Sequence, residues 1–223
     1  MWAIVPIKTF ERAKQRLSNV LTAEERRALM LAMARDVLTC LTGSARLTGI
    51  LIVSRAREAD ALAEAFGTER FIESPTSDLA GSLTQATHYL RDHFDARGIF
   101  VVPADVPCIS TAEVDAIIGD HGSITLLPDA QCVGTNGLIC SPPLAIPYIF
   151  NGKSFKPHSD LAFAAGLVPR IIPNSSFALD ADTPDDLIAI ADAQPTSQSA
   201  IYLQRSGIAD RLRTTRREQG GEP

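Results

Sequence analysis

Short runs of apolar residues alternate along this chain with longer stretches in which apolar and polar residues repeat at helical spacing. Five runs are rich in β-branched residues and bounded by Gly, Pro or Ser, which is typical of buried strands: WAIVPI at 2–7, GILIVS at 49–54, GIFVVP at 98–103, SITLLP at 123–128 and TNGLIC at 135–140. Because strands separated by helices form parallel βαβ units with both sheet faces covered, the pattern predicts an α/β fold.

Helix starts are indicated by capping residues in front of the amphipathic stretches. Thr22 with Glu25 forms a capping box for a helix reaching about Leu41, and Ser82 with Gln85 predicts the start of a helix ending near Phe94. Two further starts are predicted by the same kind of pattern: Ser110 with Glu113, and Thr183 with Pro184 and Asp186.

A change of composition near Ala193 divides the chain. Residues 1–192 are expected to form one large α/β domain, whereas residues 193–223 form a polar, Arg-rich tail that ends in GGEP. Within the tail we expect one short helix over 201–212 followed by disorder, so the tail is interpreted as an appendage.

Composition and charge exclude several classes of protein. The formal net charge of -5 over 223 residues disfavours general nucleic-acid binding, which depends on a basic surface. No apolar run approaches the roughly 20 residues of a membrane span and no secretion signal is recognised, so a cytoplasmic protein without membrane contact is expected. The cysteines lack C-x-x-C spacing and have apolar neighbours, which predicts buried free thiols rather than a disulfide or zinc site: Cys40, Cys108, Cys132 and Cys140.

Basic residues are concentrated directly after the first predicted strand, in VPIKTFERAKQRLS at 5–18. Because ligands of open parallel sheets bind beyond the carboxyl ends of the strands, this loop is a candidate anion site that could wrap a polyphosphate. The alternative is a solvated loop whose charges only face water. Neither G-x-x-x-x-G-K-[ST] nor G-x-G-x-x-G is present, so side chains would have to hold the phosphates.

Three aspartates have no evident structural task. Asp105 follows the third strand-like run, and Ser110 with Glu113 already accounts for the next helix start. In FALDADTPDDL the helix start uses Thr183 and Asp186, which leaves Asp180 and Asp182; in an extended segment, residues two apart face the same side. Carboxylate oxygens suit magnesium, although surface turn aspartates remain the alternative interpretation.

Taken together and in order, these segments resemble a known family. VPIKTFERAKQRLS is similar to the signature VPxKxxxxAKxRL, PADVP to a D-[LV]-P segment, and GTNGLIC, SFKPH and LDADTPDDL to later motifs. The family is that of the guanylyltransferases of deazaflavin coenzyme biosynthesis, which act on 2-phospho-L-lactate, phosphoenolpyruvate or 3-phospho-D-glycerate. The resemblance runs from about Trp2 to Leu187.

The resemblance implies a three-layer, GT-A-like nucleotidyltransferase fold around a mostly parallel sheet, and transfer of guanylate from GTP to a phosphorylated three-carbon acid. It implies roles for residues at matching positions. Those positions are Lys8, Lys14 and Arg16 for the GTP phosphates; Asp105, Asp180 and Asp182 for Mg²⁺; Lys14 and Asp105 as catalytic residues; and Thr135, Asn136, Ser154 and His158 for the acceptor. From their place at a predicted helix start, Ser82 and Leu83 are further candidates for guanine binding through free backbone N–H groups.

The chemistry of the residues agrees with phosphoryl transfer, since the sequence contains no G-x-S-x-G elbow for a nucleophile. Two alternatives stay open: another metal-dependent nucleotidyltransferase or GT-A-type glycosyltransferase, and a non-catalytic nucleotide-binding subunit. The sequence does not choose among the three phosphorylated acids, and an interaction with the downstream transferase of the pathway is also left open.

Overall fold

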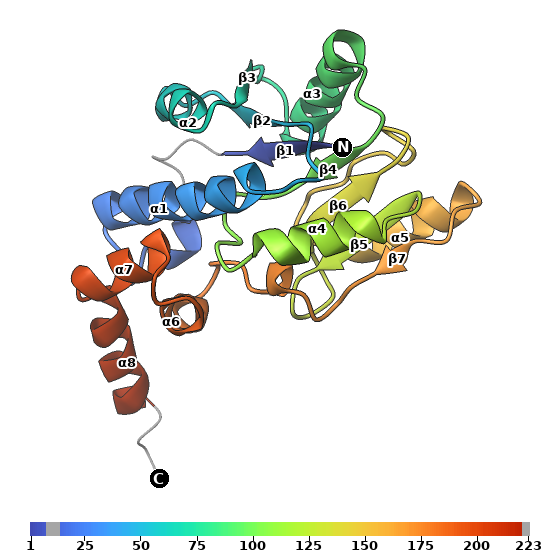
Figure 1. Cartoon of the computed structure of the whole chain (residues 1–223). Helices are drawn as coiled ribbons and strands as arrows, with labels where there is room; N and C mark the ends of the chain where they lie inside the picture. Colours follow the sequence, from blue (N-terminus) through green and yellow to red (C-terminus); the bar gives the residue numbers. More distant parts are fainter. Residues whose placement is uncertain (8–13, 220–223) are drawn as a thin grey trace.

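The computed structural model describes residues 1–7 and 14–219 of the chain, and within them seven strands form a single mixed sheet (Figure 1). The strand order is β3-β2-β1-β4-β6-β5-β7, and β6 alone among these runs antiparallel to its two neighbours. This confirms the α/β class and the mostly parallel sheet. The strands are β1 (Trp2–Pro6), β2 (Gly49–Ser54), β3 (Glu69–Ile72), β4 (Ile99–Val101), β5 (Ile124–Pro128), β6 (Thr135–Cys140) and β7 (Arg170–Ile171).

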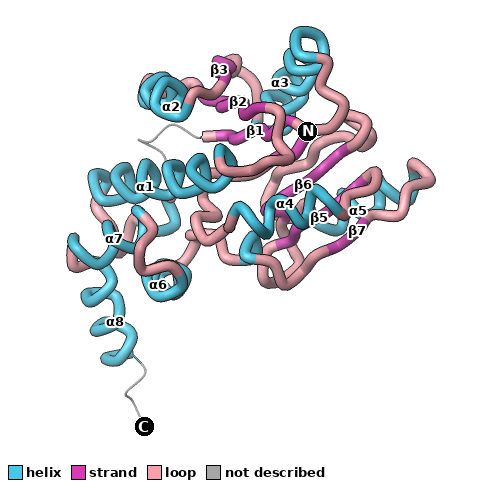
Figure 2. Tube along the Cα trace, in the orientation of Figure 1, coloured by secondary structure: helices cyan, strands magenta, loops and turns pink. Residues whose placement is uncertain are grey.

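Helices cover both faces of the sheet, which produces three layers (Figure 2). Alternation along β1 sends Ala3 and Val5 to one face and Trp2 and Ile4 to the other. The first face packs against α1 (Ala23–Thr42), α2 (Glu58–Phe66) and α4 (Thr111–Gly119). The same core extends away from the sheet through α6 (Pro184–Ala193), α7 (Gln198–Arg205) and α8 (Ile208–Gln219), which pack on one another and on α1. The second face packs against α3 (Leu79–Phe94) and α5 (Phe155–Ala164).

All five predicted strands are present, and two strands were not predicted. β3 contains Glu69 and Arg70 in only four residues, and β7 has two residues, so neither carries an apolar run that pattern analysis can recognise. Both strands lie at the edges of the sheet, where one side of the backbone needs no partner strand.

Capping predictions were confirmed at α1 and α6, where both hydrogen bonds of each capping box are present. The predicted start of α3 at Ser82 is wrong. Asp78 caps this helix instead by accepting from the Gly81 N–H at 2.8 Å, and Ser82 is buried in the helix interior. Asp78 and Ser82 are both suitable capping residues, four positions apart. The start at Asp78 adds one more helical turn, whose Leu79 and Ala80 pack against the core on the sheet.

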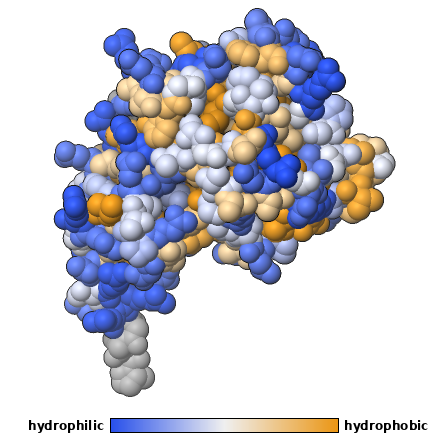
Figure 3. Space-filling view, in the orientation of Figure 1, coloured by the Kyte–Doolittle hydropathy of each residue, from blue (hydrophilic) through white to orange (hydrophobic). Residues whose placement is uncertain are grey.

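The tail also differs from its prediction, because it forms two helices rather than one. Gly207, in a left-handed conformation (φ 71°), ends α7 before α8 begins. Side chains of both helices, including Leu203 and Ile208, are fully buried in the main core, and α7 packs on α1. The outer surface around α8 is hydrophilic (Figure 3). The division at residue 192 stays a prediction.

Cys132 departs from the expected burial. All four cysteines are free thiols; Cys40, Cys108 and Cys140 are buried as predicted, but Cys132 is exposed. It lies in the turn between β5 and β6 with a left-handed backbone (φ 55°), so its apolar neighbours belong to a turn and not to a strand. Among the described residues, no helix combines the length and apolarity required to cross a bilayer. The cytoplasmic location stays a prediction.

Candidate active site

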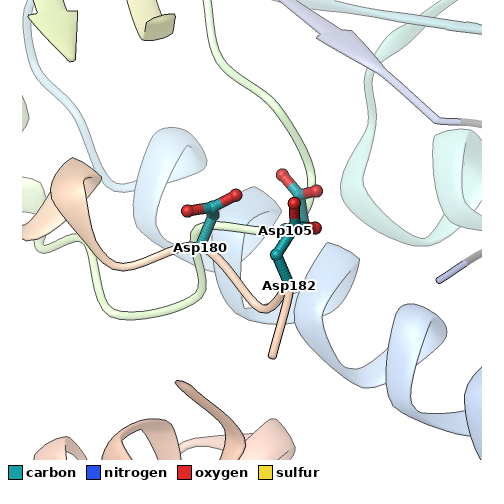
Figure 4. A group of neighbouring side chains, drawn as sticks. All are labelled: Asp105, Asp180 and Asp182. Carbon is teal, nitrogen blue, oxygen red and sulfur yellow. The ribbon is translucent and has the colours of Figure 1, made fainter. Parts of the chain in front are cut away.

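The three candidate aspartates come together at the carboxyl edge of the parallel strands. Asp105 lies in the loop after β4, and Asp180 and Asp182 lie between η3 (Ser176–Ala178) and α6 (Figure 4). A backbone hydrogen bond from the Ala181 N–H to the Asp105 carbonyl, 3.1 Å long, joins the two loops. The convergence predicted from the sequence is therefore present.

The aspartates contribute one carboxylate oxygen each to a group whose members all lie within 4.8 Å of one another. We call Asp105, Asp180 and Asp182 the carboxylate cluster. Asp180 and Asp182 face the same space because of a tight turn, in which the Asp182 N–H donates to the Asp180 carbonyl at 3.1 Å, and not because the segment is extended. An all-oxygen donor set of this kind could hold a hard divalent cation.

Lys14 supplies positive charge to the carboxylate cluster. Its Nζ donates to Asp105 Oδ2 at 2.7 Å and to Asp182 Oδ1 at 3.0 Å, and its side chain is only 7% exposed. Burial by itself lowers the pKa of Lys14, but attraction to Asp105 and Asp182 outweighs burial and raises the pKa above its ordinary value. The ammonium is therefore charged at neutral pH.

The side chain of Lys14 is buried, and its backbone is strained. Its φ of 51° lies in the left-handed region, which costs a residue with a Cβ about 1–2 kcal/mol. The two ion pairs of the side chain offset this cost. A strained residue held in place by strong contacts is typical of functional sites.

Arg16 contacts the same cluster from its outer side. It lies in η2 (Gln15–Leu17) and donates from Nη1 to Asp182 Oδ2 at 2.6 Å, while its side chain is 77% exposed. The structure thus brings Lys14 and Arg16 to the carboxylate cluster. Lys8, the third predicted phosphate ligand, lies outside the described residues.

Asp180 is an acid of the carboxylate cluster whose pKa is shifted by its surroundings. Burial, followed by repulsion from Asp105 and Asp182, raises its pKa to about 6, while Lys14 and a hydrogen bond with Asn136 act in the opposite direction. Asn136 also donates from Nδ2 to the Phe177 carbonyl at 2.9 Å. Asn136 therefore fixes the position of Asp180 from β6.

A neutral group of side chains lies at the start of β6, at the same edge of the sheet as the carboxylate cluster, and we call Thr135, Ser154 and His158 the histidine cluster. His158 is fully buried; its Nε2 accepts from the Ile149 N–H at 2.9 Å, and its Nδ1 lies 3.0 Å from Thr135 Oγ1. Burial lowers the pKa of His158 to about 4, so the ring is neutral at pH 7. Because Nε2 is the acceptor, the proton resides on Nδ1 and is donated to Thr135.

This arrangement leaves the Thr135 hydroxyl hydrogen available for another acceptor. Ser154 is at the N-cap of α5 and 2% exposed, and among the described residues its side chain makes no capping hydrogen bond. Both Thr135 and Ser154 can therefore donate to a ligand, whereas His158, with both nitrogens engaged, can act on a ligand only through Thr135.

The predicted role of Ser82 and Leu83 in guanine binding is wrong in its physical basis. Both side chains are buried inside α3, and the Ser82 N–H donates to the Asp78 carbonyl at 2.9 Å, so it is not a free helix-end donor. Sequence analysis also missed Glu73 and Ser77, which line a hollow of about 170 Å³ at the same edge of the sheet. Glu73 directly follows β3, so recognising that strand would have identified it.

Comparisons with known proteins agree with this geometry. The model of a family described as "Guanylyl transferase CofC like" matches residues 1–219. The chain is 36% identical to the phosphoenolpyruvate guanylyltransferase of Roseiflexus sp. over 92% of this chain and 93% of that protein. It is 32% identical to the 2-phospho-L-lactate guanylyltransferase of Methanobrevibacter ruminantium over 97% of this chain and 98% of that protein.

Among solved structures, a nucleotidyl transferase from Methanothermobacter thermautotrophicus superimposes with a TM-score of 0.62 and 14% sequence identity, covering 92% of this chain and 98% of that chain. At this identity the likeness concerns the fold alone. It agrees with the nucleotidyltransferase fold expected from the order of the sequence motifs.

Proposed function

Because the chain belongs to the family of CofC-like guanylyl transferases, and is thus an enzyme of the nucleotidyltransferase class, we propose that it transfers guanylate from GTP to a phosphorylated three-carbon acid. The second product is pyrophosphate, and the guanylated acid serves deazaflavin coenzyme biosynthesis. The names of the relatives support phosphoenolpyruvate and 2-phospho-L-lactate as acceptors, and 3-phospho-D-glycerate is the third candidate.

The observation that carries this proposal is the contact of Lys14 with two members of the carboxylate cluster at the carboxyl edge of the sheet. Three loops, distant in the sequence, place two cations and three acids around one point. Such a site suits a triphosphate and its counter-ion, since both signs of charge are required to hold a metal-bound polyphosphate.

The proposed reaction needs no general base. A phosphate oxygen of the acceptor is already ionised at neutral pH, because the second phosphate pKa is ~6. This oxygen forms a bond to the α-phosphorus of GTP, and the bond from that phosphorus to the oxygen bridging to the β-phosphate breaks. The electron pair of the broken bond leaves with pyrophosphate, so no proton has to move.

Asp105, Asp180 and Asp182 would hold Mg²⁺, and their carboxylate oxygens are ligands of the type that this ion prefers. When bound, Mg²⁺ supplies charge neutralisation for the α-phosphoryl group and for the two anionic substrates. Lys14 and Arg16 would bind the phosphates of GTP and stabilise the charge that grows on pyrophosphate, together with Lys8.

The histidine cluster would hold the acceptor. Thr135 and Ser154 offer hydroxyl donors to a carboxylate or phosphate oxygen, and His158 orients Thr135. Asn136 would act mainly through its hydrogen bond to Asp180.

Incubation of the full chain with GTP, Mg²⁺ and each of the three acids in parallel tests the proposal. We expect pyrophosphate release that depends on one acid, and a product in mass spectrometry with the mass of guanylate added to that acid. The next enzyme of the pathway is added to capture the product if it is unstable. Absence of pyrophosphate release with all three acids would overturn the proposal.

A further inference from the structure

A hollow of about 170 Å³ lies at the carboxyl ends of β1 and β2 and is separate from the carboxylate cluster. We call it the edge pocket. Its walls are apolar side chains of Ile7, Val53 and Leu79, and its polar groups are Arg55, Glu73 and Ser77. Apolar walls with a few convergent polar groups are typical of a small-molecule site. A larger hollow of about 390 Å³ lies between α1 and α7 and contains no residue of the candidate site.

Arg55 fixes one side of the edge pocket. Its Nε donates to Glu73 Oε1 at 3.1 Å, and its terminal nitrogens donate to the carbonyls of Ser74, Pro75 and Ser77 at 3.0–3.4 Å. The Glu73 side chain is 13% exposed. Within the described part of the chain, Glu73 Oε2 accepts no hydrogen bond. The carboxylate is therefore held in place by one oxygen and can accept from a ligand with the other.

Ser77 offers the opposite kind of group. Its Oγ accepts from Gln85 Nε2 at 3.2 Å, and no described side chain or carbonyl accepts its hydroxyl hydrogen. The edge pocket thus combines a hydroxyl donor with a nearly buried carboxylate that is acceptor-only when ionised.

We propose that the edge pocket binds the guanine base and that Glu73 determines its specificity, an inference that rests on the proposed function. Guanine presents an O6 acceptor beside two donors, the ring N1–H and the exocyclic N2 amine. Ser77 matches the acceptor, and Glu73 matches the donors. Adenine reverses the pattern, so its N1 lone pair would face the carboxylate.

The position of the edge pocket agrees with this assignment. β2, β1 and β4 are adjacent parallel strands, and Asp105 follows β4. The edge pocket and the carboxylate cluster are therefore separated by about two strand spacings, roughly 10 Å. A ribose and its phosphates can bridge this separation, which places the base in one site and the α-phosphorus in the other.

Direct binding to the full chain in Mg²⁺, measured by calorimetry with GTP, inosine triphosphate and xanthosine triphosphate, tests the assignment. Inosine lacks the N2 amine, and xanthine has an oxygen there. The wild type should bind GTP about tenfold tighter than either analogue, because each loses a hydrogen bond to Glu73. In Glu73→Gln the amide oxygen can still accept from Arg55 while its NH₂ donates to the xanthine oxygen. We expect the ratio of the affinity for GTP to the affinity for xanthosine triphosphate to fall by at least about tenfold, or the preference to invert.

Two matched variants separate specificity from general damage. Ser77→Ala should weaken GTP and xanthosine triphosphate equally, since both bases carry O6, and Glu69→Gln, an exposed change on β3, should alter nothing. If Glu73→Gln does not fold, Glu73→Asp takes its place. This variant should reduce the difference in binding affinity between GTP and inosine triphosphate.

The outcomes for the two proposals are distinct. Suppose that the wild type binds GTP tightly and that folded Glu73→Gln keeps the wild-type ratio of affinities for GTP and xanthosine triphosphate. That result would overturn only the edge-pocket assignment. A wild type that binds none of the triphosphates would overturn the proposed function and this inference with it.

Discussion

The carboxylate cluster and the histidine cluster are neighbours at one edge of the sheet, but they satisfy their polar groups in opposite ways. Asp105 and Asp182 depend on the full charge of Lys14, at 2.7 and 3.0 Å, whereas His158 and Thr135 are neutral and share one hydrogen bond. A charged cluster can exchange one cation for another, because attraction between charges depends little on direction. A neutral cluster keeps its partners, because each hydrogen bond requires a particular donor and acceptor.

This difference suggests how one site would bind the two anionic substrates of the proposed function. Under the proposed function, the carboxylate cluster would accept a metal ion with its triphosphate, while the histidine cluster would offer donors of fixed geometry to the acceptor. Substitutions in the two clusters should therefore have different effects. Those in the carboxylate cluster should change turnover and metal dependence, and those in the histidine cluster should change the dependence of stability on pH.

The largest effect is expected from Asp105→Asn. The change keeps the size of the side chain but removes a charge from the carboxylate cluster, so turnover with GTP and the acceptor should fall at least ~100-fold. Pyrophosphate release is the measurement. Asp95→Asn, on an exposed helix end, is the control and should keep full activity. Near-normal turnover of Asp105→Asn would contradict a catalytic carboxylate cluster.

Lys14→Met should destabilise the protein in the presence of a chelator. Removal of the buried ammonium takes one ion pair each from Asp105 and Asp182, at a cost of about 1–3 kcal/mol, reduced from the fully buried case because Asp105 and Asp182 are partly exposed. Denaturant unfolding measures this free energy. Added Mg²⁺ should restore much of it in the variant and stabilise the wild type less. Equal midpoints for variant and wild type in chelator would count against this account.

The histidine cluster should make stability depend on pH through His158. Its folded pKa of about 4 lies below the unfolded value of about 6.5, so the unfolded state binds the proton first. Stability is therefore full above pH 6.5 and lost as pH falls toward 4, by roughly 1–2 kcal/mol between pH 7 and pH 5.

His158→Gln should remove this part of the pH dependence, although the variant is less stable at pH 7. Unfolding midpoints at pH 7 and pH 5 measure it. His93→Gln, at an exposed position of α3, should keep the wild-type dependence. If the two variants responded alike to acid, His158 would not be the titrating group.

The smallest effect on stability is expected from Arg16→Gln. An ion pair with a 77% exposed arginine contributes less than about 0.5 kcal/mol, so the unfolding midpoint should barely change. If Arg16 binds a phosphate, the KM for GTP should nevertheless rise several-fold. A large loss of stability would show that Arg16 has a structural role instead.

Much of the fold and part of the site could be predicted from short segments. The capping boxes at Thr22 and Thr183 were predictable because their hydrogen bonds join residues three apart. Asp105, Asp180 and Asp182 could be selected because no nearby cap required them. Ser82 was misjudged because Asp78, four residues earlier, is also a good cap, and only packing of the extra helical turn decides between them.

The sequence by itself determined the α/β class, the main strands, the starts of α1 and α6, and the choice of the acidic and basic residues, because each depends on neighbours within a few positions. Tertiary structure alone decided that Lys14 is buried while Arg16 is exposed, that His158 is a neutral partner of Thr135, and that Glu73 reaches the edge pocket. These features depend on burial and on contacts between residues up to 168 positions apart, as in the pair of Lys14 and Asp182, and no local pattern encodes such contacts.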